Sequence, residues 1–233
     1  MRKVVNSSIV IFYLALCFIA TSCLSVSAEV QSSDSQKFTN LFDGKTLNGW
    51  DAYEGTSIVH NTKRWSVEDG VIMGKPHESC GNTCINTWLV SNREYSDFIL
   101  RFKYKIEAGN SGFTYRSIIG KEALDSPEVD FSADEKTTGQ IYETRTINNT
   151  YVHTGYLTNV DTGLLDTLLL ENKFNEMELR LKGSNIKVFL NGTLLTNYDH
   201  DVKTEAGRPK GFIAMELHQD TIISYKDIEI LEW

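Results

Sequence analysis

The chain has 233 residues, of which 31 are acidic and 23 basic, and its formal net charge is −8. This acidic balance, without any cluster of basic residues, excludes the usual electrostatic surface of a nucleic-acid-binding protein. The length suffices for one domain with a sizeable core, and no apolar segment of membrane-spanning length follows the first 30 residues.

Residues 1–28 are predicted to be a secretory signal peptide. Arg2 and Lys3 give a positive start, and small residues at positions 26–28 suit cleavage after Ala28. The apolar run over residues 9–20 is shorter than the roughly 20 residues that a spanning helix needs. We therefore expect an exported protein, either periplasmic or secreted.

A second processing site competes with the first. Residues 20–23, Ala-Thr-Ser-Cys, resemble a bacterial lipobox, and cleavage there would leave Cys23 as the lipid anchor of an outer-membrane lipoprotein. Under either alternative, residues 29–37 are predicted to be a polar tether and residues 38–233 a single domain.

Cys80 and Cys84 flank a short Gly-Asn-Thr segment. Export into an oxidising compartment favours a small-loop disulfide between them. The alternative is a metal site, to which His77 would supply a third ligand.

Alternating apolar and polar residues, bounded by Gly and Asn turns, predict many short β-strands. An Asp69-Gly70 turn joins two strands within residues 64–74, and the apolar phase slips at residues 226–227, which predicts a bulge in the last strand. The other predicted strands are residues 88–90, 128–131, 139–147, 174–182, 186–190, 211–218 and 221–231.

The clearest pattern lies in residues 97–116. Residues 98–106 alternate strictly apart from Ile99, as in a strand with one buried face. Residues 109–112, Gly-Asn-Ser-Gly, predict a turn, which leads into a short aromatic strand that ends on Arg116. An arginine at the exit of such a strand indicates a site rather than a core.

Helical patterns are nearly absent, and only residues 164–171 suit a short helix. Short strands at intervals of roughly 8–12 residues, separated by glycine turns, predict an all-β fold, namely an antiparallel β-sandwich or jelly roll.

Four segments, taken in order, resemble a known family. They are residues 40–50 (NLFDGKTLNGW), residues 65–72 (WSVEDGVI), residues 95–116 with their Asn-Ser-Gly and arginine, and residues 174–228. Over residues 38–233 the chain resembles the 3-keto-disaccharide hydrolase family. The resemblance implies a concanavalin-like jelly roll, an exported protein of a glycan-degrading bacterium, and cleavage of glycosidic bonds in sugars oxidised to a ketone at C3.

The resemblance also implies a site. The family's Asn-Ser-Gly and its following arginine match residues 110–112 and Arg116. Its glycine-tyrosine-glutamate segment places the glutamate at Glu128, and its leucine-glutamine-x-histidine segment ends on His218.

This chain departs from the family pattern at three places. Residues 126–127, Ser-Pro, precede Glu128 in place of glycine and an aromatic residue. Asp130 and Glu216 stand where the family has glutamine. Two of these departures add carboxyl side chains to the expected groove. Together the departures leave open whether this chain keeps the family's reaction, binds a metal or takes another sugar.

The implied chemistry begins with the C3 ketone, which acidifies the hydrogen on C2. Removal of that proton gives an enolate that expels the C1 substituent by β-elimination, after which water adds back. The step needs a base within reach of C2–H and a fixed charge or donor near the enolate. Glu128 and His218 are the alternative bases, and Arg116 is expected to stabilise the enolate.

Further residues are expected to bind the sugar through carboxylates, amides, hydroxyl groups and aromatic faces. They are Asn110, Ser111, Asp130, Glu143, Glu216, Trp88 and Tyr115, with Tyr142 as a further ring. The sequence specifies no cofactor. A glycosidase pair of Glu128 with Glu143 or Glu216 stays open, as does a divalent metal held by Glu128, Asp130, Glu216 and His218.

The alternative function is a non-catalytic, lectin-like carbohydrate-binding module of the same fold, because a fold does not fix a function. Convergence of Arg116, Glu128 and His218 in one groove favours the enzyme. A shallow aromatic face with these charges scattered favours the binding module.

Overall fold

The structure is a computed structural model that describes residues 37–55, 57–59, 62–77, 86–120, 123–133, 136–148, 150–201 and 208–233. The predicted signal peptide, Cys23, almost all of the tether, Cys80 and Cys84 lie outside these residues. Processing, export and the disulfide therefore stay predictions. In the described part of the chain, no helix is long and apolar enough to cross a membrane.

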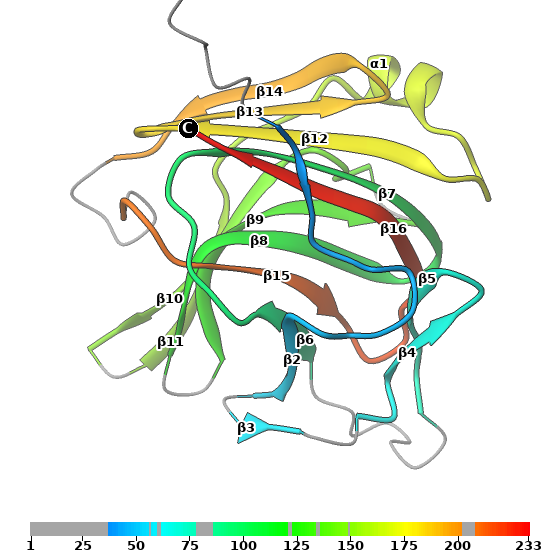
Figure 1. The fold of residues 1–233 in the computed structure, drawn as a ribbon. Coiled ribbons are helices and arrows are strands. Elements are labelled where there is room, and N and C mark those ends of the chain that lie inside the picture. Colours follow the sequence, from blue (N-terminus) through cyan, green and yellow to red (C-terminus); the bar gives the residue numbers. More distant parts are fainter. Residues whose placement is uncertain are drawn as a thin grey trace, which may run out of the picture. The chain divides into compact units, whose positions relative to one another are not determined.

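The described residues form two sheets of eight strands each, and every pairing is antiparallel. This confirms the predicted β-sandwich, which Figure 1 shows as two layers. The first sheet contains β1 (Thr39–Asn40), β4 (Trp65–Glu68), β5 (Val71–Gly74), β7 (Phe98–Ala108), β12 (Asn175–Lys182), β13 (Asn185–Leu190), β14 (Thr193–Asp199) and β16 (Ile222–Glu232). The second sheet contains β2 (Trp50–Glu54), β3 (Ser57–Ile58), β6 (Thr87–Ser91), β8 (Asn110–Ile119), β9 (Leu124–Ser132), β10 (Ile141–Ile147), β11 (Thr150–Tyr156) and β15 (Phe212–Leu217).

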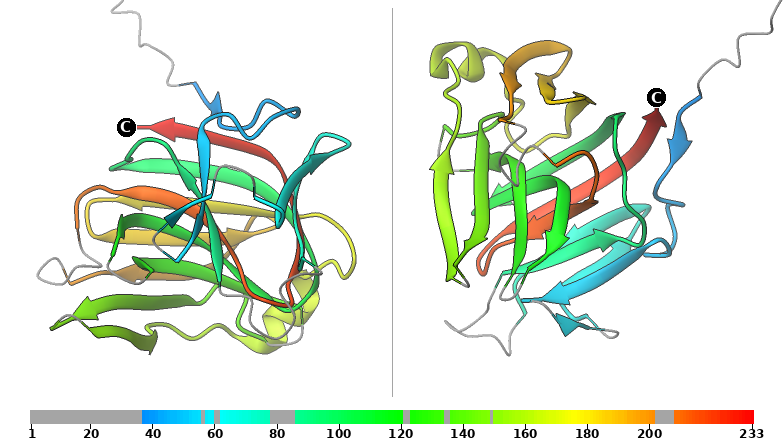
Figure 2. Two further views of the ribbon diagram at one scale, coloured as in Figure 1. Left: turned by 90° about the horizontal axis from the view of Figure 1, so that it is seen from below. Right: turned by 90° about the vertical axis from the view of Figure 1, so that its left-hand side faces the viewer.

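Strand order brings distant segments together. The first sheet runs β14-β13-β12-β7-β16-β5-β4, with β1 also paired to β16, and the second runs β11-β10-β9-β8-β15-β6-β2-β3. Strands β9, β8 and β15 are therefore neighbours in the middle of the second sheet, although β15 lies about a hundred residues further along the chain. Both views of Figure 2 place the hairpin of β10 and β11 at one edge of the molecule.

The alternation in β7 builds the core as predicted. Phe98, Leu100, Phe102 and Tyr104 are buried between the sheets, while the residues between them face outward. Phe102 stacks on Phe113 of the second sheet with ring centroids 4.5 Å apart. The two inner faces thus interlock through aromatic side chains.

Three further local predictions agree with the structure. The hairpin of β4 and β5 turns through Asp69 and Gly70, which both have positive φ, as its type I′ signal requires. The bulge in β16 falls at Asp227. The short helix α1 (Thr162–Leu168) begins two residues before the predicted start, because the Asp161 side chain accepts hydrogen bonds from the first free N–H groups.

Strand β8 differs from its prediction at both ends. Only Gly109, with φ of 75°, turns the chain, and Asn110 already belongs to the strand. Arg116 does not end the strand, which continues to Ile119. Instead Arg116 has φ of 49° and lies in a bulge, where the register with β9 shifts between Thr114 and Ile118.

The bulge explains how β9 tolerates a proline. A proline has no N–H to give to a ladder, so it is found at sheet edges or at bulges. Pro127 lies in the stretch of β9 that faces the irregular part of β8. The prediction of a strand beginning after Pro127 is therefore wrong, because β9 begins at Leu124.

The Arg116 side chain ties the two sheets together. It is 2% exposed, and it donates hydrogen bonds to the carbonyl oxygens of Gly183 at 2.6 Å and Ser96 at 3.2 Å, and to Asp97 Oδ1 at 2.8 Å. All three partners belong to loops that border strands of the first sheet. The guanidinium is therefore a structural anchor between the sheets.

Replacing Arg116 with alanine should destabilise the fold, because it removes a buried side chain and the donor of two carbonyl groups and one carboxylate. We expect the free energy of unfolding to fall by about 2–4 kcal/mol, as measured by urea denaturation. Arg93→Ala is the control, since the Arg93–Glu232 pair is half exposed and should cost much less. An Arg116→Ala protein as stable as the control would contradict the anchor.

Candidate active site

The face of the second sheet that points away from the core carries a cavity of about 700 Å³. Strand alternation decides what lines it. Phe113, Val129 and Met215 point into the core, so the residues next to them on β8, β9 and β15 point into the cavity. These neighbours include Glu128 and Glu216, which places two carboxyl groups on one floor.

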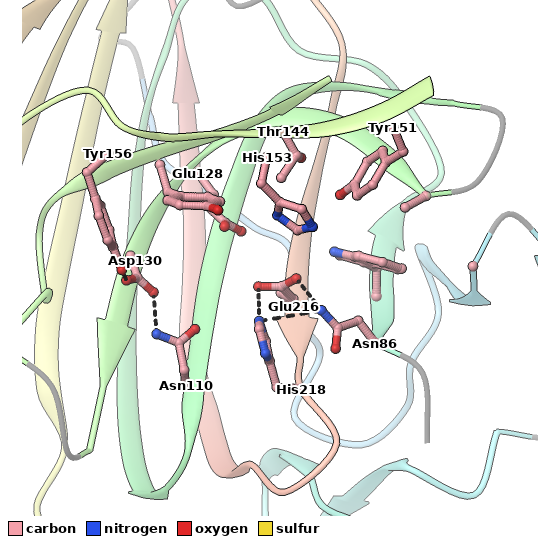
Figure 3. A pocket seen from close by; sticks show the side chains of 14 residues that line it. Asn86, Asn110, Glu128, Asp130, Thr144, Tyr151, His153, Tyr156, Glu216 and His218 are labelled. Carbon is pink, nitrogen blue, oxygen red and sulfur yellow. Dashed lines mark hydrogen bonds and ion pairs between the residues drawn. The ribbon is translucent and has the colours of Figure 1, made fainter. Parts of the chain in front are cut away.

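Glu216 is the centre of a polar cluster. Its Oε2 lies 3.1 Å from His218 Nε2, and its Oε1 accepts a hydrogen bond of 3.2 Å from Asn86 Nδ2. Glu128, two strands away on β9, is hydrogen-bonded to it as well. Figure 3 shows Glu216 held between His218 and Asn86 beneath the hairpin that carries His153 and Tyr151.

The environment separates the protonation states of the two glutamates. Burial, followed by the negative charges of Glu216 and Asp130, raises the pKa of Glu128 well above its ordinary value. Burial alone would also raise the pKa of Glu216. The charge and hydrogen bond of His218, with hydrogen bonds from Glu128 and Asn86, outweigh this effect and hold that pKa below its ordinary value. The pair therefore carries one proton, which resides on Glu128.

His218 completes the set. Burial alone would lower the pKa of His218, but the neighbouring Glu216 carboxylate outweighs burial and raises the pKa above its ordinary value. Its side chain remains 37% exposed and lines the cavity, so it is accessible to a ligand. The floor thus presents a carboxylic acid, a carboxylate and a basic imidazole in sequence.

Gly112 allows the two glutamates to meet. It lies on β8, between the strands that carry Glu128 and Glu216. A Cβ on Gly112 would stand 2.6 Å from Glu128 Oε2 and 2.9 Å from its carboxyl carbon. The missing side chain therefore leaves the space through which the Glu128 carboxyl crosses the intervening strand. This is a spatial requirement, since the φ of Gly112 is not in the left-handed region.

Asp130 organises a second corner of the cavity. It accepts hydrogen bonds from Asn110 Nδ2 at 2.8 Å and from the Tyr156 hydroxyl at 2.5 Å. Burial raises the pKa of Asp130, although these hydrogen bonds oppose the shift. Asp130 therefore fixes an amide and a phenol at the cavity wall.

The hairpin of β10 and β11 supplies an aromatic wall that the sequence did not predict, except for Tyr142. Tyr142 and Tyr156 meet edge to face at 5.0 Å, and Tyr151 and His153 do so at 5.3 Å. A register shift beside Glu143 lets both His153 and Tyr156 face the cavity. The aromatic residues within 151–156 were the signal from which the sequence could have predicted this strand. Asn86, which borders residues 78–85 in the sequence, gave no such signal.

Seven of the predicted site residues lie together in the cavity, and four do not. The seven are Trp88, Asn110, Glu128, Asp130, Tyr142, Glu216 and His218. Among the four, Arg116 serves the anchor described above, so its predicted place beside the enolate is wrong.

The other three fail because strand alternation points them away from the cavity. Ser111 is buried in the core and donates to the Glu216 carbonyl at 2.7 Å, and the Tyr115 hydroxyl lies 2.8 Å from His200 Nε2. Glu143 faces away from the cavity and accepts a hydrogen bond of 3.0 Å from the Thr154 hydroxyl, so it cannot pair with Glu128. Glu216 does lie beside Glu128, but two carboxyl groups in hydrogen-bond contact are closer than the pair of an ordinary glycosidase.

The metal alternative gains no support from this geometry. Within the described ranges, no three histidine, cysteine, aspartate or glutamate side chains are grouped so that they could hold a metal ion. The cysteine alternative lies outside those ranges.

Comparison with known proteins places the chain in a family. The family described as the 3-keto-alpha-glucoside-1,2-lyase-like domain matches residues 37–231. A curated relative, the 3-keto-disaccharide hydrolase of Bacteroides thetaiotaomicron, is 29% identical over 89 residues, which are 35% of this chain. The match covers only 28% of that relative's length.

Solved structures share the fold. A candidate glycosyl hydrolase from Parabacteroides distasonis aligns with a TM-score of 0.54 and 26% identity, over 84% of this chain and 100% of its own. The carbohydrate-binding module CBM66 of Bacillus subtilis aligns with a TM-score of 0.53 and 16% identity, over 79% and 96% of the two chains. The fold is thus found both in a candidate enzyme and in a binding module, so the side chains of the cavity have to decide between them.

Replacing Gly112 with alanine should separate the two glutamates, because the new methyl group occupies the position of the Glu128 carboxyl. We expect a loss of about 1–3 kcal/mol in the free energy of unfolding from overpacking. The pKa of Glu128, followed by NMR of its carboxyl carbon, should fall as the carboxyl moves away from Glu216. Gly163→Ala in α1 is the matched control, since a Cβ at position 163 would have Asp161 Oδ1 as its nearest neighbour, at 3.3 Å. An unchanged Glu128 pKa would contradict the role of Gly112.

Proposed function

The chain belongs to the 3-keto-alpha-glucoside-1,2-lyase-like domain family, and on that premise we propose that it cleaves the glycosidic bond of 3-keto-glycosides by eliminating the C1 substituent. The family supports a glycosidase-like activity on sugars, and the 3-keto substrate and the elimination are the finer part of the proposal. The observation that carries it is the row of Glu128, Glu216 and His218 on one cavity floor, with Glu216 Oε2 3.1 Å from His218 Nε2.

His218 is the base of the proposed reaction. Its Nε2 faces Glu216, so Nε2–H donates to that carboxylate and Nδ1 carries the free electron pair. Nδ1 accepts the proton from C2, and the electron pair of the C–H bond moves into the enolate that the C3 ketone stabilises. Glu216 fixes the tautomer and offsets the positive charge that forms on the imidazole, as the carboxylate does in a catalytic triad.

Glu128 is the acid of the proposed reaction. The enolate collapses to a C1–C2 double bond, and the C1–O bond breaks. The departing oxygen needs a proton, which the carboxylic acid of Glu128 supplies. The products are an alcohol and an unsaturated 3-keto sugar, and addition of water at C1 would complete a net hydrolysis.

The position of each group along the strands fits the substrate. His218 directly follows β15, and Glu216 lies two residues before it on the cavity-facing side of that strand. The Glu128 carboxyl reaches Glu216 across Gly112, so Glu216 stands between the base and the acid on the cavity floor. A sugar lying along it would present C2–H to His218 and the C1 oxygen to Glu128.

The enolate oxygen needs a donor in place of Arg116. The imidazolium that His218 becomes and the Asn110 amide, which Asp130 holds in the cavity, are suitable groups among those that line it. The proposal therefore replaces a permanent cation with one that forms during the reaction.

The purified full-length protein should release the alcohol from 3-keto-glucosides and 3-keto-disaccharides, and it should leave the unoxidised glycosides intact. Deuterium at C2 should slow the reaction if removal of that proton limits the rate. His218→Gln should lose about 100-fold or more in kcat. Saturable binding of intact glycans without product release would favour the lectin-like alternative instead.

The pH profile tests the assigned roles. Activity should rise as His218 loses its proton and fall as Glu128 loses its own. The negative charge of Glu216 raises the pKa values of both His218 and Glu128. Replacing Glu216 with glutamine removes this charge, so both limbs of the pH profile should move to lower pH.

Glu143→Gln, a carboxyl on the opposite face of the same sheet, is the control and should leave both limbs in place. A Glu216→Gln protein with unshifted limbs would refute the coupling. A complete loss of turnover at every pH would assign proton abstraction to Glu216 itself.

A further inference from the structure

The cavity has two chemically different ends. Along β15, the cavity-facing residues change from Glu216 to Ala214. Ala214 is level with Glu128 through Thr114, and β9 continues past Glu128 to Leu124, which packs in the same apolar cluster as Ala214. The ionisable floor therefore gives way to an apolar one at Ala214 on β15 and beyond Glu128 on β9.

The apolar end is a hydrophobic cluster separate from the core between the sheets. It consists of Tyr53, Trp88, Val90, Ala123, Leu124 and Ala214, with Tyr151 and Phe212 packed against it. Trp88, Ala123 and Tyr151 also line the cavity. A ligand that extends past Glu128 therefore meets an indole, a phenol ring and a methyl group.

The two hydroxyl groups at this end, those of Thr144 and Tyr151, already have hydrogen-bond partners. The Thr144 hydroxyl donates to the carbonyl oxygens of Leu124 at 3.2 Å and Ser126 at 3.5 Å. The Tyr151 hydroxyl is hydrogen-bonded to Thr144 in turn. A second sugar ring bound here would bury hydroxyl groups that find few hydrogen-bond partners among the described residues, which is unfavourable. An apolar group would have no such cost.

From this arrangement we infer that the apolar end, formed by Trp88, Tyr151 and Ala123, is a leaving-group site that selects aromatic or other apolar alcohols over a second sugar. The inference rests on the proposed function, because that function places the C1 oxygen at Glu128. The leaving group then extends from Glu128 onto the apolar cluster, whose Trp88 stands beside Glu216 on the neighbouring strand β6. The substrates of the chain are accordingly 3-keto-glycosides of hydrophobic alcohols.

The test compares leaving groups of similar acidity, so that differences report contacts rather than intrinsic reactivity. The three substrates are 3-keto-glucosides of benzyl alcohol, methanol and glucose, and cleavage releases each of these as an alcohol. We expect the wild-type kcat/KM to be highest for the benzyl substrate. Trp88→Ala should reduce the benzyl-to-methyl ratio of kcat/KM by about tenfold, and Tyr151→Ala should reduce it in the same direction.

The matched control is Trp233→Ala, because Trp233 is 44% exposed and stacks on Lys182 of the first sheet. It should leave the ratio unchanged. If Trp88→Ala fails to fold, the inference is still tested by Tyr151→Ala and by the preference of the wild type among the three substrates. Equal or better turnover of the glucosyl substrate would overturn the inference while the proposed function stands.

If no 3-keto-glucoside is cleaved, the proposed function fails and binding decides the inference separately. Benzyl glucoside should then still quench tryptophan fluorescence saturably in the wild type, and the quenching should be lost in Trp88→Ala. Absence of any saturable quenching in the wild type would overturn the leaving-group site as well.

Discussion

Two carboxyl groups in hydrogen-bond contact cannot both be ionised at low cost, and the floor of the cavity depends on this constraint. Glu128 and Glu216 meet across β8 because Gly112 offers no side chain between them. The proton they share stays on Glu128, since His218 and Asn86 stabilise the charge on Glu216. One backbone position without a side chain therefore lets the two carboxyls meet, and the partners of Glu216 decide which carboxyl is the acid and which orients the imidazole.

The motif Asn110-Ser111-Gly112 gains a physical explanation from this geometry. Its members alternate in direction, as residues of a strand must. Asn110 is held in the cavity by Asp130, Ser111 supports the core through the Glu216 carbonyl, and Gly112 makes room for Glu128. Three consecutive residues thus serve one site, one of them from the opposite face of the sheet.

Arg116 shows how a residue type misleads when its partners are distant. A buried guanidinium can bind a ligand or satisfy backbone carbonyl groups, and the local sequence is the same in both cases. Here its partner Gly183 lies 67 residues further along the chain. The anchor holds the sheets together at one end, and the reacting groups stand elsewhere on the second sheet. A site without a permanent cation then relies on an imidazole that gains its charge during the reaction.

The sequence by itself determined most of the strands and their turns and the sandwich or jelly-roll class, and it named seven residues that the structure gathers in one cavity. These follow from side-chain alternation and from positive φ at glycine and asparagine, which act over a few residues. Only the tertiary structure decided that Arg116 anchors the sheets, which face of β8 and β10 borders the cavity and so excludes Tyr115 and Glu143, and that β11 brings its aromatic wall to the site. The places of Arg116 and of the β11 wall depend on bulges, which reverse the phase of alternation, and the cavity depends on strand order, which unites β9, β8 and β15. Neither is encoded within a few residues of the side chains that it positions.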